Sequence, residues 1–487
     1  MKRLFDMHRY YIQKNQVKYI INHLNNIENH QIYLLISLAM DATMQYNDDD
    51  PLSDPKPNPN VIKKYNSIMD SNWVLRSSYL VLLMQAGFSL LESGMVRAKN
   101  TKNILVKNLI TTALGAIIFF GIGYSLSFDS GKSYSNPLIA CCSFFSLEEG
   151  DYYVWVSKWA FSSIACTIIN GSVSERTKIV AYLILNTVVP GIIYPLAAHW
   201  IWNEGGWLYQ LGVVDYGGGI AVHVLGGTIG LVGTMLLGPR LGKFDPETGK
   251  PLVLSEHNIV LSSIGTLFLW FSWYGQHPVL YGMDLNKSRI ASRGAINTTL
   301  SGSISMVTSF VITVVSTKRY DLKICINGLL AGFVASSASA GFIEPYYSII
   351  VGVVSSFIFI GFSKLLLRYQ IDDPCQSTSV HFACGIWGAV SCGLFSDSSL
   401  LDEVYKNREN HQSIIEGVFI QLIGVSATII WCTILAYVVF KILKKYSLLR
   451  VDSDIELTGF DNAHHGGAAY NYRSYKNNSN SNSNSHS

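Results

Sequence analysis

The sequence predicts an all-α integral membrane protein with eleven transmembrane helices: five helices, an inverted repeat of these five, and an eleventh helix outside the repeat. Three observations predict this fold class. Charged residues make up 14% of the 487 residues, well below the ~25% of soluble domains. The mean hydropathy is +0.26, and long apolar segments alternate with short polar loops. Finally, an Asp–His pair recurs in two distant apolar segments.

The apolar segments lie between residues 73 and 440. A helix needs ~20 residues to cross ~30 Å of hydrocarbon, and most of the segments reach that length. The eleven segments are, in chain order, 73–95, 104–127, 152–171, 178–203, 215–238, 258–282, 290–316, 324–342, 345–367, 379–396 and 414–440.

The ends of the chain are polar. NDDDPLSDPKPNPN, residues 47–60, is typical of an extended linker because proline cannot continue a helix. The final Asn/Ser repeat cannot bury enough apolar surface to fold. The expected units are an N-terminal extension and linker at 1–70, a membrane domain at 71–446 with repeat halves at about 73–238 and 258–396, a cytoplasmic tail at 447–470, and a disordered tail at 471–487.

The basic residues predict the orientation. Loops after the odd-numbered segments carry most of the loop Lys and Arg residues, and the opposite loops carry few, among them Lys132 and Lys158. Because cytoplasmic loops are the basic ones, we expect the N-terminus outside or in a lumen. An odd number of spans then places the C-terminus in the cytoplasm.

The two Asp–His pairs are DYGGGIAVH, from Asp215 to His223, and DPCQSTSVH, from Asp373 to His381. An odd number of crossings separates the two histidines, so their helices run in opposite senses. Inverted repeats place the site that they share near the membrane midplane. We therefore expect His223 and His381 to face each other there.

Each of these side chains has two interpretations. A neutral histidine donates and accepts one hydrogen bond, so it suits a pore, but either histidine alone could also bond to a carbonyl of a neighbouring helix. Asp215 and Asp373 stand where a carboxylate caps helix N–H groups. Capping is the preferred interpretation for Asp373. For Asp215 we expect an additional role beside a cation at the outer mouth.

Aromatic residues gather at the outer end of the fourth segment, where HWIWNEGGW includes Trp200, Trp202 and Trp207. An interfacial aromatic belt accounts for them. Alternatively, one ring faces a vestibule and attracts a small cation, which is worth ~0.5–2 kcal/mol. Phe161 packs by default, and spacing alone leaves these alternatives open.

The composition argues against several other functions. The net charge of +3 is small and scattered, so no nucleic-acid partner is expected. The eight cysteines form no CxxC pair, and only Cys141 and Cys142 are disulfide candidates. No catalytic motif predicts an enzyme, and no metal or cofactor is expected. A haem-bearing redox protein, which needs a histidine pair at each haem, is the alternative from another class.

Several motifs together resemble the Amt/Mep/Rh family of ammonium transporters over residues of about 70 to 470. These motifs are LMQAGFSLLESGMVRAKNTKN (83–103), FSSIACTIINGSVSERTK (161–178), YPLAAHWIW (194–202), DYGGGIAVHVLGG (215–227), GPRLGKF (238–244), INGLLAGFVA (326–335) and VHFACGIWG (380–388). The resemblance implies an eleven-helix homotrimer with one conduction path per subunit, which agrees with the topology above.

The resemblance also implies roles for individual residues. Phe161 is implied as an outer gate ring, Trp202 as part of the outer ammonium vestibule, Asp215 as an acidic residue that supports recruitment or deprotonation, His223 and His381 as the twin pore histidines, and Trp273 as a pore-lining ring. The tail resembles a segment that couples neighbouring subunits. There Gly459, Asp461 and His465 match, whereas Gly467 stands in place of the usual Glu.

The chain departs from the family pattern after WYG, where it reads QHPVL. Gln276 replaces a second gate Phe, and Leu280 replaces a recruitment Ser. Leu280 lacks the hydroxyl that would accept a hydrogen bond from the cation, so we expect weaker recruitment. Phe382 also replaces a Gly beside His381.

The expected function is recruitment of ammonium at an outer vestibule and conduction of ammonia, with or without a separate proton, through a twin-histidine pore. The expected partners are ammonium or ammonia and membrane lipid. The expected location is the plasma membrane or an endosomal or vacuolar membrane. The alternative is a weakly conducting or non-conducting ammonium sensor, or a regulatory subunit of a mixed trimer, and the QHPVL departure is its supporting feature.

Overall fold

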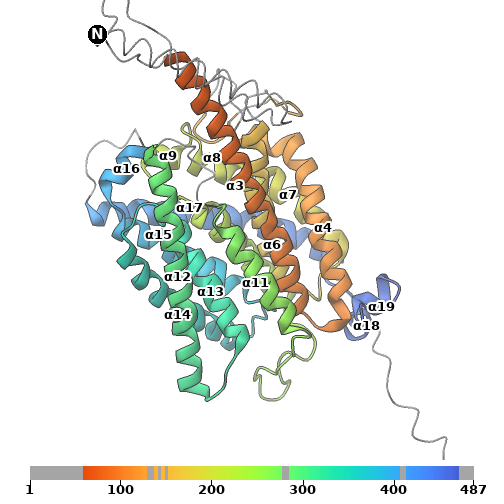
Figure 1. Ribbon diagram of the computed structural model, residues 1–487. Helices are drawn as coiled ribbons and strands as arrows, with labels where there is room; N and C mark the ends of the chain where they lie inside the picture. Colours follow the sequence, from red (N-terminus) through yellow and green to blue (C-terminus); the bar gives the residue numbers. More distant parts are fainter. Residues whose placement is uncertain are drawn as a thin grey trace, which may run out of the picture. The chain divides into compact units, whose positions relative to one another are not determined.

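The computed structural model describes residues 59–128, 136–140, 144–147, 152–276, 285–405 and 413–470. The chain divides into two units, Met1–Asp70 and Ser71–Ser487. Of the first unit, only the residues from Pro59 onward, where a helix begins, fall within the described ranges. The second unit is a bundle of helices (Figure 1).

The helices from Pro59 to Leu237 cover the first five predicted segments. They are α3 (Pro59–Met95), η1 (Ala98–Asn100), α4 (Thr101–Ile118), η2 (Phe119–Gly123), α5 (Tyr124–Ser127), α6 (Tyr152–Ser172), α7 (Ile179–Val188), η4 (Val189–Ile193), α8 (Tyr194–Trp202), α9 (Trp207–Leu211), η5 (Gly219–Val224) and α10 (Leu225–Leu237).

The helices from Ile259 onward cover the other six segments and the tail. They are α11 (Ile259–Trp273), α12 (Leu285–Thr317), α13 (Leu322–Ser337), α14 (Pro345–Arg368), η7 (Thr378–Ala383), α15 (Cys384–Phe395), α16 (Ser398–Val404), α17 (Ile414–Lys445), α18 (Ser453–Thr458) and α19 (Phe460–His464).

Length and hydropathy mark eight of these helical runs as able to cross a membrane, and α11 and α13 are shorter apolar helices. The chain is therefore an α-helical membrane protein. Every predicted apolar segment overlaps a helix of the described residues. That all eleven cross the membrane, and that they form an inverted repeat, remain predictions.

Two sequence-based expectations are corrected. The linker predicted at 47–60 is too long by two residues, because α3 begins at Pro59. Proline is favoured at the first helical position, where its missing N–H costs nothing. In addition, Lys158 is not a loop residue, because it lies in the second turn of α6 and its side chain is buried.

Side-chain caps fix the start of several helices. The Asn258 Oδ1 atom accepts a hydrogen bond from the Leu261 N–H at 3.0 Å, which starts α11. The Asp321 Oδ1 atom accepts one from the Ile324 N–H at 3.1 Å, which starts α13. Such caps satisfy backbone donors that have no partner within the helix.

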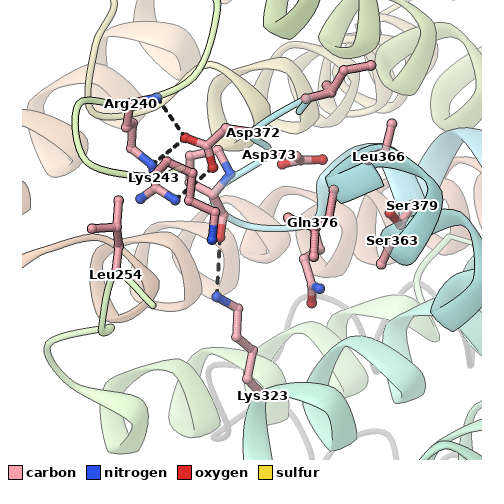
Figure 2. A pocket seen from close by; sticks show the side chains of 13 residues that line it. Arg240, Lys243, Leu254, Lys323, Ser363, Leu366, Asp372, Asp373, Gln376 and Ser379 are labelled. Carbon is pink, nitrogen blue, oxygen red and sulfur yellow. Dashed lines mark hydrogen bonds and ion pairs between the residues drawn. The ribbon is translucent and has the colours of Figure 1, made fainter. Parts of the chain in front are cut away.

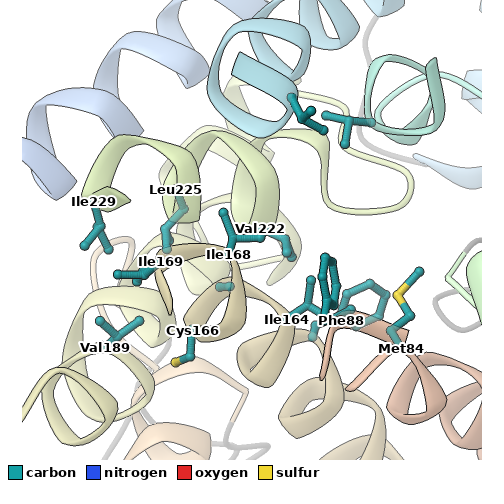
Figure 3. Packing of buried hydrophobic residues seen from close by; sticks show 14 of the residues in the cluster. Met84, Phe88, Ile164, Cys166, Ile168, Ile169, Val189, Val222, Leu225 and Ile229 are labelled. Atoms are coloured by element: carbon teal, nitrogen blue, oxygen red, sulfur yellow. The ribbon is translucent and has the colours of Figure 1, made fainter. Parts of the chain in front are cut away.

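The apolar core runs between α3, α6 and α10. Met84 and Phe88 of α3 lie beside Ile164 of α6, while Leu225 and Ile229 of α10 lie above the next turns of α6 (Figure 3). In the second half, α12 packs against α13 and α14. This core holds the segments η5 and η7, which carry the two histidines.

The tail helices α18 and α19 lie at one end of the bundle, beside the turn between α3 and α4 (Figure 1). We call this end the tail end. The helical run α7–η4–α8 begins beside the tail, where the Lys178 N–H bonds to the Leu449 carbonyl at 3.0 Å. That run finishes at Trp202, and we call this opposite end the Trp202 end.

Candidate functional site

Both histidines lie on π-helical turns. His223 belongs to η5, residues Gly219–Val224, and His381 belongs to η7, residues Thr378–Ala383. A π-helical turn widens the backbone spiral, and such turns are frequent at functional sites. The Asp–His spacing showed the repetition, but helical periodicity does not reveal a π turn.

The two imidazoles face each other. The Nδ1 atoms of His223 and His381 are 3.2 Å apart, and the ring centroids are 5.1 Å apart at 21°. Both side chains are buried. One Nδ1 atom must donate and the other must accept, so the pair holds a single proton between its Nδ1 atoms.

The histidine pair lies among aromatic rings. Trp273, at the end of α11, stacks on His223 with ring centroids 5.4 Å apart and an interplanar angle of 16°. On the other side, Phe88 of α3 lies 6.1 Å from the His381 ring. Rings from α3 and α11 therefore flank the row of imidazole nitrogen atoms.

Gln276 extends this row of nitrogen atoms on the His223 side. The Gln276 Nε2 atom lies 3.4 Å from the Nε2 atom of His223, and the residue is fully buried. When the amide donates, His223 carries its proton on Nδ1 and donates it toward His381, whose own proton is then on Nε2. The sequence marked Gln276 as a departure from a family pattern but did not predict this contact.

Asp215 is a helix cap. Its Oδ2 atom accepts hydrogen bonds from the N–H groups of Ile220 and Ala221, at 3.0 and 2.9 Å. Asp373 caps η7 in the same way, with its Oδ2 atom 2.6 Å from the Thr378 N. The capping expected for both aspartates is present, and it orients the two histidine turns.

Trp202 and Phe161 contact each other at the Trp202 end. Their ring centroids are 5.3 Å apart at 61°, and Phe161 is fully buried, whereas Trp202 is half-buried. The Trp202 Nε1–H donates to the backbone carbonyl of Asp215 at 2.8 Å. This bond holds the indole beside the loop that leads to His223.

Three buried polar atoms of this region have no hydrogen-bond partner among the described residues. They are Asp215 Oδ1, Trp273 Nε1 and Gln276 Oε1. Because an unsatisfied buried polar atom costs about 1–3 kcal/mol, such atoms require an explanation. A small polar molecule bound beside them would satisfy them.

A cluster of charges lies at the tail end. Glu175 forms ion pairs with Arg97 and Arg240, and Arg240 also pairs with Asp372, with 2.7 Å between the Arg240 Nε and Asp372 Oδ2 atoms. Arg240, Asp372 and Lys323 line a cavity of about 90 Å³, and Figure 2 shows their side chains. The cluster ties the loop after α10 to the loop before η7.

These ion pairs shift the pKa values of the carboxyl groups of Glu175 and Asp372. Burial alone would raise the pKa of Glu175, but Arg240 and Arg97 lower it below its usual value. Burial would likewise raise the pKa of Asp372, and the facing Arg240 lowers it instead. Both groups are therefore charged at neutral pH.

The tail residues of the family motif contact the start of α4. The Asp461 carboxylate accepts hydrogen bonds from the N–H groups of Lys102 and Asn103 at 3.0 and 3.1 Å. The His465 Nε2 atom lies 3.4 Å from Asn103 Oδ1. Gly459 has a φ of +98°, and a Cβ atom there would lie 2.5 Å from Lys99 Cβ. The tail therefore docks on its own chain.

Several residues named in the sequence analysis lie outside the described residues or away from the sites above. Leu280, Cys141 and Cys142 lie outside the described residues, as do the extension up to residue 58 and the Asn/Ser tail from residue 471. Phe382 is described, and its ring lies 5.8 Å from that of Phe362 on α14. The Phe382 ring therefore lies beside α14.

The fold and the buried histidine pair define a helical membrane protein with a polar interior. The model of the Ammonium Transporter Family matches residues 72–470. Ammonium transporter 3 of Dictyostelium discoideum is 40% identical over 408 residues, which are 82% of this chain and 94% of that protein. Ammonium transporter Amt2 of Archaeoglobus fulgidus is 34% identical over 425 residues, 82% of this chain and 88% of that protein.

A solved structure titled Sensor Amt Protein has a TM-score of 0.76 and 28% identity, covering 82% of this chain and 99% of that one. The family match extends over most of the membrane domain and the docked tail. The chain belongs to the ammonium transporter family.

Proposed function

We propose that this protein recruits ammonium at the Trp202 end and conducts ammonia past His223 and His381, with or without a separate proton. The observation that carries the proposal is the buried histidine pair, with Nδ1 atoms 3.2 Å apart in a row with Gln276. The atoms Asp215 Oδ1 and Gln276 Oε1 support it, because both are buried and have no hydrogen-bond partner among the described residues.

The energetics favour ammonia over ammonium inside the path. Ammonium is protonated at neutral pH, and an isolated charge in an apolar interior is costly. Trp202 and Asp215 would attract the cation at the mouth, where the ring quadrupole and the carboxylate favour positive charge. The imidazoles offer both donor and acceptor atoms to ammonia after it loses its proton, and they can relay a proton.

Several finer features belong to the same proposal. Eleven helices cross the membrane as a five-plus-five inverted repeat and an added helix. The Trp202 end faces outward or into a lumen, and the tail end faces the cytoplasm. Three copies form a homotrimer in the plasma membrane or an endosomal or vacuolar membrane. In this trimer Gly459, Asp461 and His465 belong to a regulatory tail, and Phe161 is the outer gate ring.

A sensor with this fold is the second candidate, since one similar structure is titled as a sensor. Curated relatives of higher identity are named transporters, so we propose transport. The test is uptake of labelled methylammonium by a transport-deficient host that expresses the full chain. Saturable uptake above the empty-vector level, abolished by excess ammonium, supports transport. Surface expression with uptake equal to the empty vector contradicts it.

A further inference from the structure

Lys158 places an ammonium group against the ring proposed to recruit ammonium. It lies on α6, one turn before Phe161, and its side chain is buried. The Nζ atom is 4.7 Å from the centroid of the Trp202 ring and 4.4 Å from that of Phe128. Both distances are within the range of a cation–π contact.

Aromatic rings are the neighbours that stabilise this cation. Among the described residues, no carboxylate forms an ion pair with Lys158, whereas Arg97, Arg240 and Lys323 at the tail end each have at least one carboxylate partner. A buried cation without a counter-ion is costly. The negative faces of the Trp202 and Phe128 rings offset part of that cost.

The rest of the Trp202 ring is already engaged. Phe161 meets it at 61° with centroids 5.3 Å apart, and the indole N–H donates to the Asp215 carbonyl. An ammonium ion has the same chemistry as the lysine head group, so it would seek the ring surface that Lys158 occupies. The two cations repel each other and cannot hold the same face together.

We propose that Lys158 is a tethered competitor of the substrate, whose side-chain ammonium occupies the cation-binding face of Trp202. The substrate must displace this group, so Lys158 raises the ammonium concentration at which recruitment is half-saturated. The inference rests on the proposed recruitment at Trp202 and adds an affinity-determining residue to it. Lys158 thereby works in the same direction as the change predicted at Leu280.

The test compares Lys158→Met, which is neutral and of similar length, with Lys158→Arg, which keeps the charge. The first readout is the ammonium dependence of the melting temperature of purified full-length protein, with sodium chloride as the salt control. A ligand that binds the folded state stabilises it in proportion to its occupancy. The second readout is the concentration dependence of methylammonium uptake.

We expect Lys158→Met to lower the half-saturating concentration about tenfold in both readouts, which corresponds to one cation–π contact. Lys158→Arg should stay within about twofold of the unchanged protein. Lys158→Gln serves if the methionine variant does not fold. Lys107→Met is the matched control, because Lys107 is another buried lysine, 3.7 Å from the Tyr182 ring at the tail end. It should leave the half-saturating concentration unchanged.

The other outcomes separate the competitor role of Lys158 from the proposed transport. Equal half-saturation in Lys158→Met and the unchanged protein, or weaker binding in the variant, overturns the competitor role even when transport is intact. Tighter binding without uptake in any variant keeps the competitor role and contradicts conduction. The absence of both binding and uptake in every variant contradicts the inference and the proposed function together.

Discussion

The Nδ1 atoms of His223 and His381 lie 3.2 Å apart, each on a π-helical turn whose start is capped by an aspartate. The capping bonds of Asp215 and Asp373 fix the two turns, and the turns fix the rings. The contact is thus a product of both halves of the chain. A displaced turn in either half would separate the two nitrogen atoms.

Gln276→Leu should disturb the proton arrangement of the histidine pair. The change removes the amide 3.4 Å from His223 Nε2, and the loss of about one hydrogen bond lowers transport up to tenfold. Imidazole ¹⁵N shifts of labelled protein should report an altered tautomer population for His223. Gln421→Leu is the matched control, because it removes a different buried side-chain amide, which donates a hydrogen bond to the Val214 carbonyl. Identical spectra for Gln276→Leu and the unchanged protein would show that Gln276 does not set the tautomer.

Gly459→Ala should release the docked tail. The added Cβ would lie 2.5 Å from Lys99 Cβ, in a backbone conformation that favours glycine. Protease cleavage between Ser453 and His464 should then become much faster in purified protein. Gly466→Ala is the control, since its φ is +69° but no atom lies within 4 Å of the added Cβ. Equal cleavage rates in the two variants would argue against steric docking at Gly459.

Asp372→Asn should destabilise the tail end by about 3–5 kcal/mol at neutral pH, because it leaves Arg240 without one of its partners. The pKa of Asp372 is lowered in the folded state. The ion pair therefore stabilises the protein fully above the unfolded-state pKa of ~3.9. This stabilisation is lost as the pH falls through the lower folded-state pKa. The difference in melting temperature from the unchanged protein should therefore narrow below about pH 4.

The control for this pH series is Asp397→Asn. The Asp397 carboxylate caps α16 through the Ser399 N–H, and asparagine caps almost as well. The melting temperature of Asp397→Asn should follow that of the unchanged protein over the whole pH series. A gap between Asp372→Asn and the unchanged protein that stays constant down to pH 3 would contradict the ion-pair account.

The helical segments and the histidine contact could be predicted because they leave a direct pattern in the sequence. Apolar runs reveal helices, and the repeated Asp–His spacing relates His223 to His381. The π turns could not be predicted, because an extra residue in a turn hardly changes apolar periodicity. The position of Lys158 could not be predicted either, because a lysine near a helix end usually reaches water. Only the fold shows that its head group lies on the Trp202 ring.

The most direct test of the conduction path uses liposomes that contain purified protein and an internal pH indicator. The variant His223→Leu with His381→Leu keeps apolar bulk but removes all four ring nitrogen atoms. After an ammonium pulse, we expect at least about tenfold slower initial ammonia entry in the variant than in the unchanged protein, at equal protein content and melting temperature. Entry at the rate of the unchanged protein would show that ammonia does not pass the histidine pair.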